Sequence, residues 1–257
     1  MRAQTVETLA RFSLEGRRGI VTGGSSGLGL AISRLLAQAG AEVFVFSRSG
    51  RVKSAGAGPD PQGIHHVAVD VGDPAALATA LAAIGADGLD FLVNNAGITQ
   101  KKAATDFAAG EFRAIQQVNV DAVFALCQLA FPFLSQAPGA GRIVNISSMA
   151  AHLGFSEVVP YCASKAAVLG LTRGLAVEWA AHNVRVNSIA PGWFPSEMNR
   201  QIMDHERQKK ILGRMPMHRY GAPDELANMV LFLVSPAASY ITGVDFAVDG
   251  GALAYGY

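Results

Sequence analysis

Hydrophobic positions along the chain alternate between short β-branched runs and longer stretches in which apolar residues recur with the period of a helix. The short runs predict strands that end near Thr22, Phe46, Val69, Val93, Ile146, Ile189 and Val248. The longer stretches predict helices over Gly27–Gln38, Pro74–Ile84, Glu111–Leu134, Tyr161–Ala180 and Pro223–Leu233. Such alternation is typical of βαβ units, so we expect an α/β fold with a doubly wound parallel sheet of about seven strands and helices on both faces.

Two polar stretches interrupt this pattern. Residues 51–63 contain three glycines and two prolines and predict an exposed loop after the second strand. Residues 198–219 are long enough to form a helix, which predicts a substrate lid around 193–219. No Pro- or Ser-rich linker divides the sequence, so we expect one domain over residues 1–257.

Composition and charge exclude several classes of protein. Half of the 257 residues are hydrophobic and 16% are charged, a balance that suits a large buried core. The formal net charge is +1 and no basic stripe alternates with aromatic residues, so we expect no nucleic-acid partner. Cys127 and Cys162 are too few for a disulfide framework and belong to no CxxC motif, which predicts reduced thiols and no bound metal.

The sequence also argues against export and against a membrane span. Residues 1–16 carry charges at positions 2, 7, 11 and 15, so they lack the uninterrupted apolar centre of a secretion signal. The apolar segments 123–134 and 166–181 are broken by Gln128 and Pro132, or by Arg173 and Glu178, and fall short of a span. We therefore expect a cytoplasmic protein with no membrane partner.

A glycine cluster follows the first predicted strand and opens the first predicted helix; residues 19–30 read GIVTGGSSGLGL. Gly23, Gly27 and Gly29 would let the backbone turn tightly and approach a pyrophosphate, whose negative charge is favoured at a helix N-terminus. The alternative is that these glycines only make a compact strand-to-helix turn. The order of strand, glycines and helix favours a dinucleotide site.

The end of the second predicted strand bears on which dinucleotide binds. In a dinucleotide fold this position lies beside the adenosine ribose, and an acidic side chain there favours NAD(H). Here the sequence is Phe46-Ser47-Arg48, in which Ser47 supplies no anion and Arg48 could make charge-assisted bonds to a 2′-phosphate. We expect NADP(H) to be preferred, with NAD(H) as the alternative if Arg48 is only a solvated surface cation.

Tyr161 and Lys165 form a candidate reacting pair. They are four residues apart, so on a helix they share one face. A free tyrosine has a pKa of about 10, and a nearby ammonium favours its ionised form. The spacing therefore predicts that Lys165 lowers the pKa of Tyr161 and makes it an acid/base group near neutral pH.

Three ordered motifs point to one family: TGGSSGLG, NNAG at Asn94–Gly97, and YCASK beginning at Tyr161. In these motifs the sequence resembles the classical short-chain dehydrogenase/reductase family. The resemblance implies a Rossmann-like fold and an oxidoreductase that transfers hydride between a nicotinamide and a ketone or secondary alcohol. It also implies a homotetramer built on the two long helices and the C-terminal strand.

The resemblance further implies a catalytic tetrad of Asn119, Ser148, Tyr161 and Lys165. Ser148 lies thirteen positions before Tyr161, as the family's serine does. In carbonyl reduction, Ser148 would hydrogen-bond the substrate oxygen, Tyr161 would protonate it, and Lys165 would hold the nicotinamide ribose. Asn119 would support a proton-relay water from within a long helix.

Other residues are implied to line the cofactor. Asp70 would accept a hydrogen bond from the adenine amino group, and Ser196 would contact the nicotinamide carboxamide. Ser26 is a departure, because NADP-preferring members often carry a basic residue in the glycine loop. The expected set is Gly23, Ser25, Ser26, Gly27, Leu28, Gly29, Ser47, Arg48, Asp70, Val71, Asn95, Ala96, Gly97, Tyr161, Lys165, Pro191, Gly192 and Ser196.

The substrate stays open at this point. Bulky side chains cluster around the predicted lid, where they could surround a mostly apolar substrate or simply pack the lid on the core: Trp193, Phe194, Met198, Met203 and Met215. The resemblance extends to reductases of sugar acids, of acyl ketones such as 3-oxoacyl thioesters, and of other secondary alcohols.

Two other functions compete with this interpretation. A nucleotide-sensing or scaffold protein could keep the same fold, but it would not need Ser148, Tyr161 and Lys165 together. A serine hydrolase is disfavoured, because GRIVNISSMA is not a GxSxG elbow and no motif places a histidine to activate Ser148.

Overall fold

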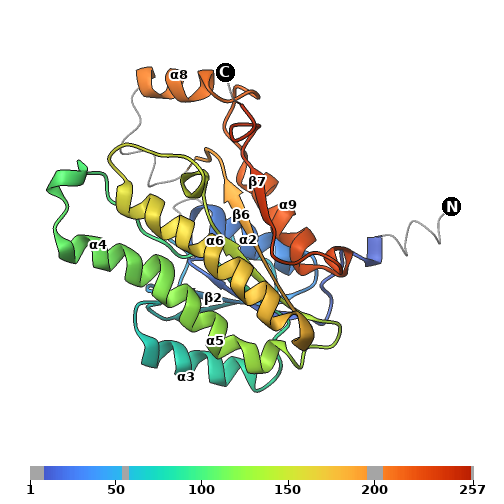
Figure 1. Cartoon of the computed structure of the whole chain (residues 1–257). Coiled ribbons are helices and arrows are strands. Elements are labelled where there is room, and N and C mark those ends of the chain that lie inside the picture. Colours follow the sequence, from blue (N-terminus) through green and yellow to red (C-terminus); the bar gives the residue numbers. More distant parts are fainter. Residues whose placement is uncertain (1–8, 54–57, 196–204, 256–257) are drawn as a thin grey trace.

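The computed structural model describes residues 9–53, 58–195 and 205–255, in which seven parallel strands form one sheet (Figure 1). The strands are β1 (Arg18–Thr22), β2 (Glu42–Ser47), β3 (Ile64–Ala68), β4 (Phe91–Asn94), β5 (Gly141–Ile146), β6 (Val184–Pro191) and β7 (Asp245–Val248). Each predicted strand end lies within two residues of an observed one. The predicted α/β fold is confirmed.

The order of the strands places a crevice at one edge of the sheet. Across the sheet the order is β3-β2-β1-β4-β5-β6-β7, so the chain reverses its direction of winding beside β1. All pairs are parallel, and β1 pairs with β4 through Ile20 and Leu92. The loops that follow β1 and β4 therefore leave the same edge side by side, where doubly wound sheets bind their ligands.

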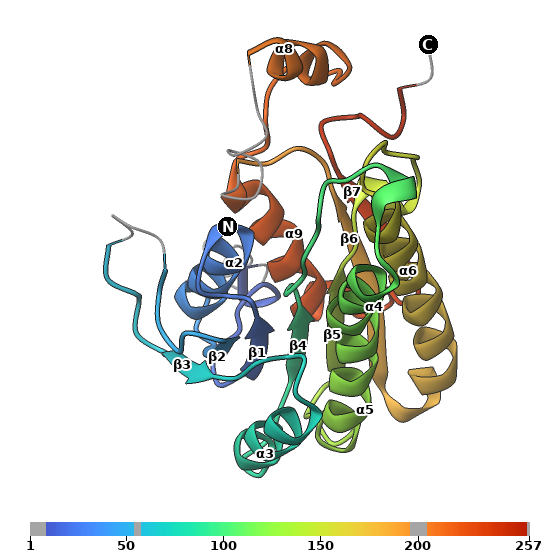
Figure 2. The ribbon, with the colours of Figure 1, turned by 90° about the vertical axis from the view of Figure 1, so that its left-hand side faces the viewer.

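Helices cover both faces of the sheet. The α-helices of the described residues are α2 (Gly27–Gln38), α3 (Pro74–Gly85), α4 (Ala109–Gln116), α5 (Ala122–Leu134), α6 (Val159–Trp179), α8 (His205–Gly213) and α9 (Pro223–Val234). The helices α2 and α9 pack on one face, and α3, α5 and α6 pack on the other (Figure 2). In both views α8, which lies inside the predicted lid, projects beyond the ends of the strands.

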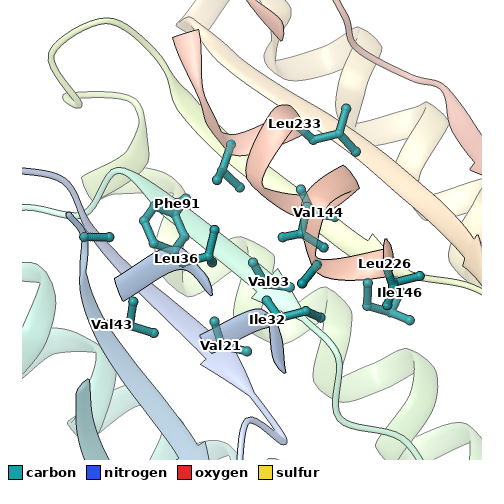
Figure 3. Packing of buried hydrophobic residues seen from close by; sticks show 14 of the residues in the cluster. Val21, Ile32, Leu36, Val43, Phe91, Val93, Val144, Ile146, Leu226 and Leu233 are labelled. Carbon is teal, nitrogen blue, oxygen red and sulfur yellow. The ribbon is translucent and has the colours of Figure 1, made fainter. Parts of the chain in front are cut away.

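Two hydrophobic clusters hold these layers together. On the first face, Val21, Val93 and Val144 pack beneath Ile32 of α2 and Leu226 of α9 (Figure 3). The intervening strand residues point to the opposite cluster. Because the central strands are buried on both faces, they read in the sequence as continuous apolar runs.

The long helix predicted over Glu111–Leu134 has an interruption that its pattern does not reveal. Between α4 and α5, the residues Gln117–Asp121 form a π-helical turn. A π-helical turn widens the helix locally and is frequent at functional sites. Asn119 lies in this turn and is fully buried.

We expected the apolar segment 123–134 to fall short of a membrane span. In the structure this segment is the second half of a longer helical run, Ala109–Leu134, so the expectation is corrected. The run is 26 residues long, and its most apolar window has a mean hydropathy of 1.4, enough by length and composition alone. Core helices of soluble proteins pass the same test. Here 39% of that window is buried inside the fold, where Leu126 and Ala130 contribute to the core.

Candidate active site

The loop between β1 and α2 is shaped for the close approach of an anion. Gly23 and Gly27 have φ angles of +67° and +54°, which residues with side chains rarely adopt. A Cβ atom on Gly27 would meet no described atom within 4 Å, so this side of the loop is open. No described side chain caps the start of α2, and its first turn holds no acidic residue. Its N–H groups therefore suit a pyrophosphate.

The segment after β4 is held against this loop. The hydroxyl of Thr22 accepts hydrogen bonds from the backbone N–H groups of Asn95 and Ala96, each at 3.0 Å. The side-chain amide of Asn95 donates to the Thr22 carbonyl at 2.9 Å. A Cβ atom on Gly29 would lie 2.5 Å from the same amide, so only glycine allows α2 to approach this closely. Sequence reasoning missed Thr22, which precedes the glycine motif.

Basic residues follow the end of β2 in the sequence. Ser47 is buried, whereas Arg48 is exposed, and no described side chain pairs with its guanidinium. The backbone N–H of Lys53 donates to the Ser25 carbonyl at 2.9 Å, so the loop after β2 folds back onto the glycine loop. Sequence reasoning missed Lys53; the signal was the closely spaced Arg48, Arg51 and Lys53.

The remaining predicted cofactor residues lie at the same edge of the sheet. Asp70 follows β3, is exposed, and uses Oδ1 to accept the N–H of Gly72 at 2.9 Å. A Cβ atom on Gly192 would lie 2.5 Å from Cα of Asp249, so the turn after β6 packs directly on the chain that leaves β7. Ser196 lies outside the described residues.

Tyr161 and Lys165 converge on one face of α6, as their spacing predicts. Nζ of Lys165 is 5.6 Å from the centroid of the Tyr161 ring and donates to the Ile146 carbonyl at 2.7 Å. Ser148, just beyond β5, hydrogen-bonds the side chain of Tyr161. Its oxygen also accepts the N–H of Ala150 at 3.1 Å, which leaves its own O–H available to donate.

Burial shifts both titratable groups of this pair toward their neutral forms. Burial raises the pKa of Tyr161, and the hydrogen bond with Ser148 opposes the shift. Burial lowers the pKa of Lys165 to about 8. The predicted net lowering of the Tyr161 pKa is therefore wrong, because the effect of burial dominates. Tyr161 is protonated at neutral pH, the form that can donate to a carbonyl oxygen.

Asn119 fixes the chain beside this pair. Its Oδ1 accepts the N–H of Ile98 at 2.8 Å, and its Nδ2 donates to the Ile98 carbonyl at 2.9 Å and to the Ser164 hydroxyl at 3.0 Å. A Cβ atom on the adjacent Gly97 would lie 3.3 Å from Asn119 Oδ1 and 3.6 Å from Lys165 Nζ. The structure thus brings the four predicted tetrad residues together at the end of the NNAG segment.

The bulky lid residues lie around a separate cavity of about 570 Å³. Trp193, Phe194 and Met215 line it together with residues of α9 and of the chain after β7. Phe194 and Met215 are buried, so they pack the lid region on the core. None of the tetrad residues is among the described residues that line this cavity, while Met198 and Met203 lie outside the described part of the chain.

Comparisons with known proteins agree with this geometry. A family model described as "Enoyl-(Acyl carrier protein) reductase" matches residues 23–252. The 2-dehydro-3-deoxy-D-gluconate 5-dehydrogenase of Escherichia coli (strain K12) is 37% identical over 257 residues, covering 96% of this chain and 99% of its own length. The gluconate 5-dehydrogenase of Gluconobacter oxydans (strain 621H) is 37% identical over 246 residues, which cover 93% of this chain and 96% of its own length.

A solved structure is similar over almost the same length. The gluconate 5-dehydrogenase from Burkholderia cenocepacia J2315, in complex with NADP and tartrate, superposes with a TM-score of 0.87 at 32% identity. The superposition covers 96% of this chain and 99% of that one. The chain therefore belongs to the classical short-chain dehydrogenase/reductase family, whose members are NAD(P)-dependent oxidoreductases acting on CH–OH or C=O groups.

Proposed function

We propose that this protein is a single nucleotide-binding and catalytic domain that prefers NADP(H) and interconverts a secondary alcohol of a sugar acid with the corresponding ketone. The observation that carries the proposal is the convergence of Ser148, Tyr161, Lys165 and Asn119 beside Gly97 at the C-terminal edge of the sheet. The names of the similar enzymes support a sugar acid as the substrate class.

The chain's own residues supply the proton chemistry. In the direction of reduction, bound NADPH supplies the hydride to the carbonyl carbon. Ser148 donates a hydrogen bond to the carbonyl oxygen and Tyr161 transfers its phenolic proton to it. As the phenol loses its proton, the nearby Lys165 ammonium stabilises the phenolate. With a pKa of about 8, Lys165 is mostly charged at neutral pH.

The preference for NADP(H) is supported by the charge around β2. Arg48 is exposed and pairs with no described side chain, so its guanidinium is available to a 2′-phosphate. Lys53 adds a second cation on a loop that is tied to Ser25 of the glycine loop. The similar Burkholderia enzyme was crystallised with NADP.

A sugar acid is an anion at neutral pH, and Lys101 is the cation that fits its carboxylate. Lys101 lies on the loop that follows Gly97, and its Nζ is 3.0 Å from Oε2 of Glu157, four residues before Tyr161. Glu157 is half exposed and has a φ of +69°, a strained conformation for this residue. Lys102 is held by two contacts instead of one, since its Nζ donates to both carboxylate oxygens of Glu111 at 2.9 Å. We assign the carboxylate of the substrate to Lys101.

The test is a substrate comparison with purified full-length protein and NADP⁺. D-gluconate and the neutral polyol D-glucitol are oxidised in parallel, and a 5-keto sugar acid and a 3-oxoacyl thioester are reduced with NADPH. We expect kcat/KM for the sugar acid to exceed that for the polyol by about 10–100-fold, the usual effect of one charge-assisted contact. Lys101→Met should reduce this ratio without changing the polyol's kcat/KM.

Three outcomes would contradict the proposal. A preference for the thioester would move the substrate to the acyl class. Equal kcat/KM for acid and polyol would exclude recognition of the carboxylate. NADPH binding without turnover of any of these compounds would favour the nucleotide-sensing or scaffold alternative.

We further propose that the protein is a soluble, cytoplasmic homotetramer. Large apolar side chains remain exposed on the outer surfaces of the long helices and around the edge strand β7: Phe112, Phe124, Val159, Val177, Tyr240 and Val244. Symmetric association would cover such surfaces.

A further inference from the structure

A buried carboxylate outside the tetrad joins strands β6 and β7 to the loop of the catalytic serine. Asp245 opens the edge strand β7, and its side chain is only 8% exposed. Its Oδ1 accepts the hydroxyls of Ser147 at 3.0 Å and of Ser188 at 2.5 Å. Its Oδ2 lies 2.7 Å from Nε2 of His152. An ionised carboxylate only accepts hydrogen bonds, so the imidazole Nε2 is the donor in this pair.

These contacts fix the segment 147–152 at both ends. Ser147 directly precedes the catalytic Ser148, and His152 directly follows the short 3₁₀ helix Met149–Ala151 that Ser148 caps. Within the segment, the N–H of Ala150 donates to Ser148 Oγ at 3.1 Å, and the N–H of Ser147 donates to the Ile189 carbonyl at 2.8 Å. One carboxylate therefore closes the six-residue segment into a loop, with the Ser148 hydroxyl held inside it.

The loop determines where the Ser148 hydroxyl points. Ser148 is the N-cap of the 3₁₀ helix, so a shift of its backbone would break the bond to Ala150 and move the oxygen that contacts Tyr161. Hydrogen-bonding side chains and hydride donors must be placed to within about 0.5 Å for efficient transfer. The bond of His152 to Asp245 fixes the downstream end of the loop, where no strand pairing does so.

We propose that Asp245 and His152 form a positioning pair that orients the catalytic Ser148 toward Tyr161 and the substrate oxygen. The inference rests on the proposed function, because it assigns Ser148 the role of hydrogen-bond donor to the substrate. The pair differs from the histidine–carboxylate pair of serine hydrolases, in which the carboxylate contacts Nδ1 and Nε2 faces the serine, because here Asp245 contacts Nε2. It acts on the reaction only through the serine loop.

The test uses four variants of the full-length protein: His152→Leu, His152→Gln, Ser148→Ala and the double variant His152→Leu/Ser148→Ala. His152→Leu should lower kcat about tenfold or more, the effect of a roughly 1 Å misplacement, while the Kd of NADPH changes less than about twofold. The amide of His152→Gln can donate to Asp245 and should restore at least half of the wild-type kcat. In the Ser148→Ala background, His152→Leu should cause no further loss.

The matched control is His65→Leu, which breaks another histidine–carboxylate pair, between His65 and Glu42 at 3.1 Å on the opposite side of the sheet. Its kcat should stay within about twofold of the wild type, as for most surface changes. Full kcat in His152→Leu would overturn the proposal. So would an equal loss from His152→Leu with and without Ser148, because the histidine would then act by another route.

A second measurement separates this inference from the proposed function. Amide hydrogen exchange of Ala150, whose N–H donates to Ser148 Oγ, needs no substrate. Exchange should be faster in His152→Leu than in the wild type and in His152→Gln. If the wild type turns over none of the substrates, the proposed function fails while faster exchange still supports the positioning pair; unchanged exchange would overturn the pair in either case.

Discussion

Burial acts on Tyr161 and Lys165 in the same sense, since it favours the uncharged form of each. It raises the pKa of the phenol and lowers the pKa of the amine to about 8. A protonated phenol and a mostly protonated amine at neutral pH suit carbonyl reduction, in which the phenol donates. The lowered pKa of Lys165 also means that the folded protein releases this proton more easily than the unfolded chain does.

This difference predicts how stability depends on pH. Between pH 8 and 10 the unfolded chain binds the Lys165 proton more often than the folded chain, so this group makes the free energy of unfolding rise with pH. The rise is at most about 1.4 kcal/mol per pH unit. Urea unfolding of the wild type and of Lys165→Met at pH 7.5, 8.5 and 9.5 measures it. The free energy of unfolding of the wild type minus that of Lys165→Met should increase with pH. A constant difference would refute the lowered pKa of Lys165.

The proposed preference for NADP(H) predicts the effect of replacing Arg48. Its guanidinium is exposed and unpaired within the described chain, so Arg48→Ala should remove a charge-assisted bond to the 2′-phosphate. We expect KM for NADPH to rise about 10–100-fold, with KM for NADH nearly unchanged. NADH is the internal control, because it lacks the 2′-phosphate. Equal changes in KM for both cofactors would show that Arg48 does not bind that phosphate.

At the level of elements, the π-helical turn between α4 and α5 turns the side chain of Asn119 toward the backbone of Ile98. The two hydrogen bonds to Ile98 satisfy polar groups that would otherwise be buried without partners. The turn thereby couples a long core helix to the segment that follows the NNAG motif.

Asn119→Ala should therefore lower both stability and turnover. We expect the free energy of unfolding to fall by about 1–3 kcal/mol, because the N–H and carbonyl of Ile98 lose their partner. We expect kcat to fall as well, since Gly97 and Lys165 lie beside this contact. Gln117→Ala is the control in the same turn; its exposed side chain should change stability by less than about 0.5 kcal/mol. An unchanged melting transition in Asn119→Ala would contradict the assigned role.

Over the whole molecule, the sheet could be predicted because its central strands are buried on both faces and appear as apolar runs. The convergence of Tyr161 and Lys165 followed from the geometry of one helix. The raised pKa of Tyr161 could not be predicted, because it depends on burial by neighbours distant in the sequence. Asp245 lies 93 residues from His152, so no local spacing signals their contact. The π-helical turn leaves the apolar pattern of its helix unbroken.

The proposed homotetramer gives a prediction at this scale. The chain mass is 26.9 kDa, so a tetramer has a mass of about 108 kDa by light scattering. Phe124 is exposed on the outer side of α5, and Phe124→Lys would bury an unpaired charge in an interface. We expect this variant to have half of the tetramer mass or less. Ala83→Lys, at an exposed position of α3, should remain tetrameric. A monomeric wild type would exclude the assembly.

Transfer of deuterium from 4-deuterated NADPH to a 5-keto sugar acid, followed by mass spectrometry, tests the central claim most directly. The wild type should produce a hydroxy acid one mass unit heavier than that formed from ordinary NADPH, by direct hydride transfer. Tyr161→Phe should keep the fold and NADPH binding but form this product about 10²–10⁴ times more slowly, the usual contribution of a general acid. A wild type that binds NADPH without labelling the product, or a Tyr161→Phe variant with near-normal turnover, would contradict the account.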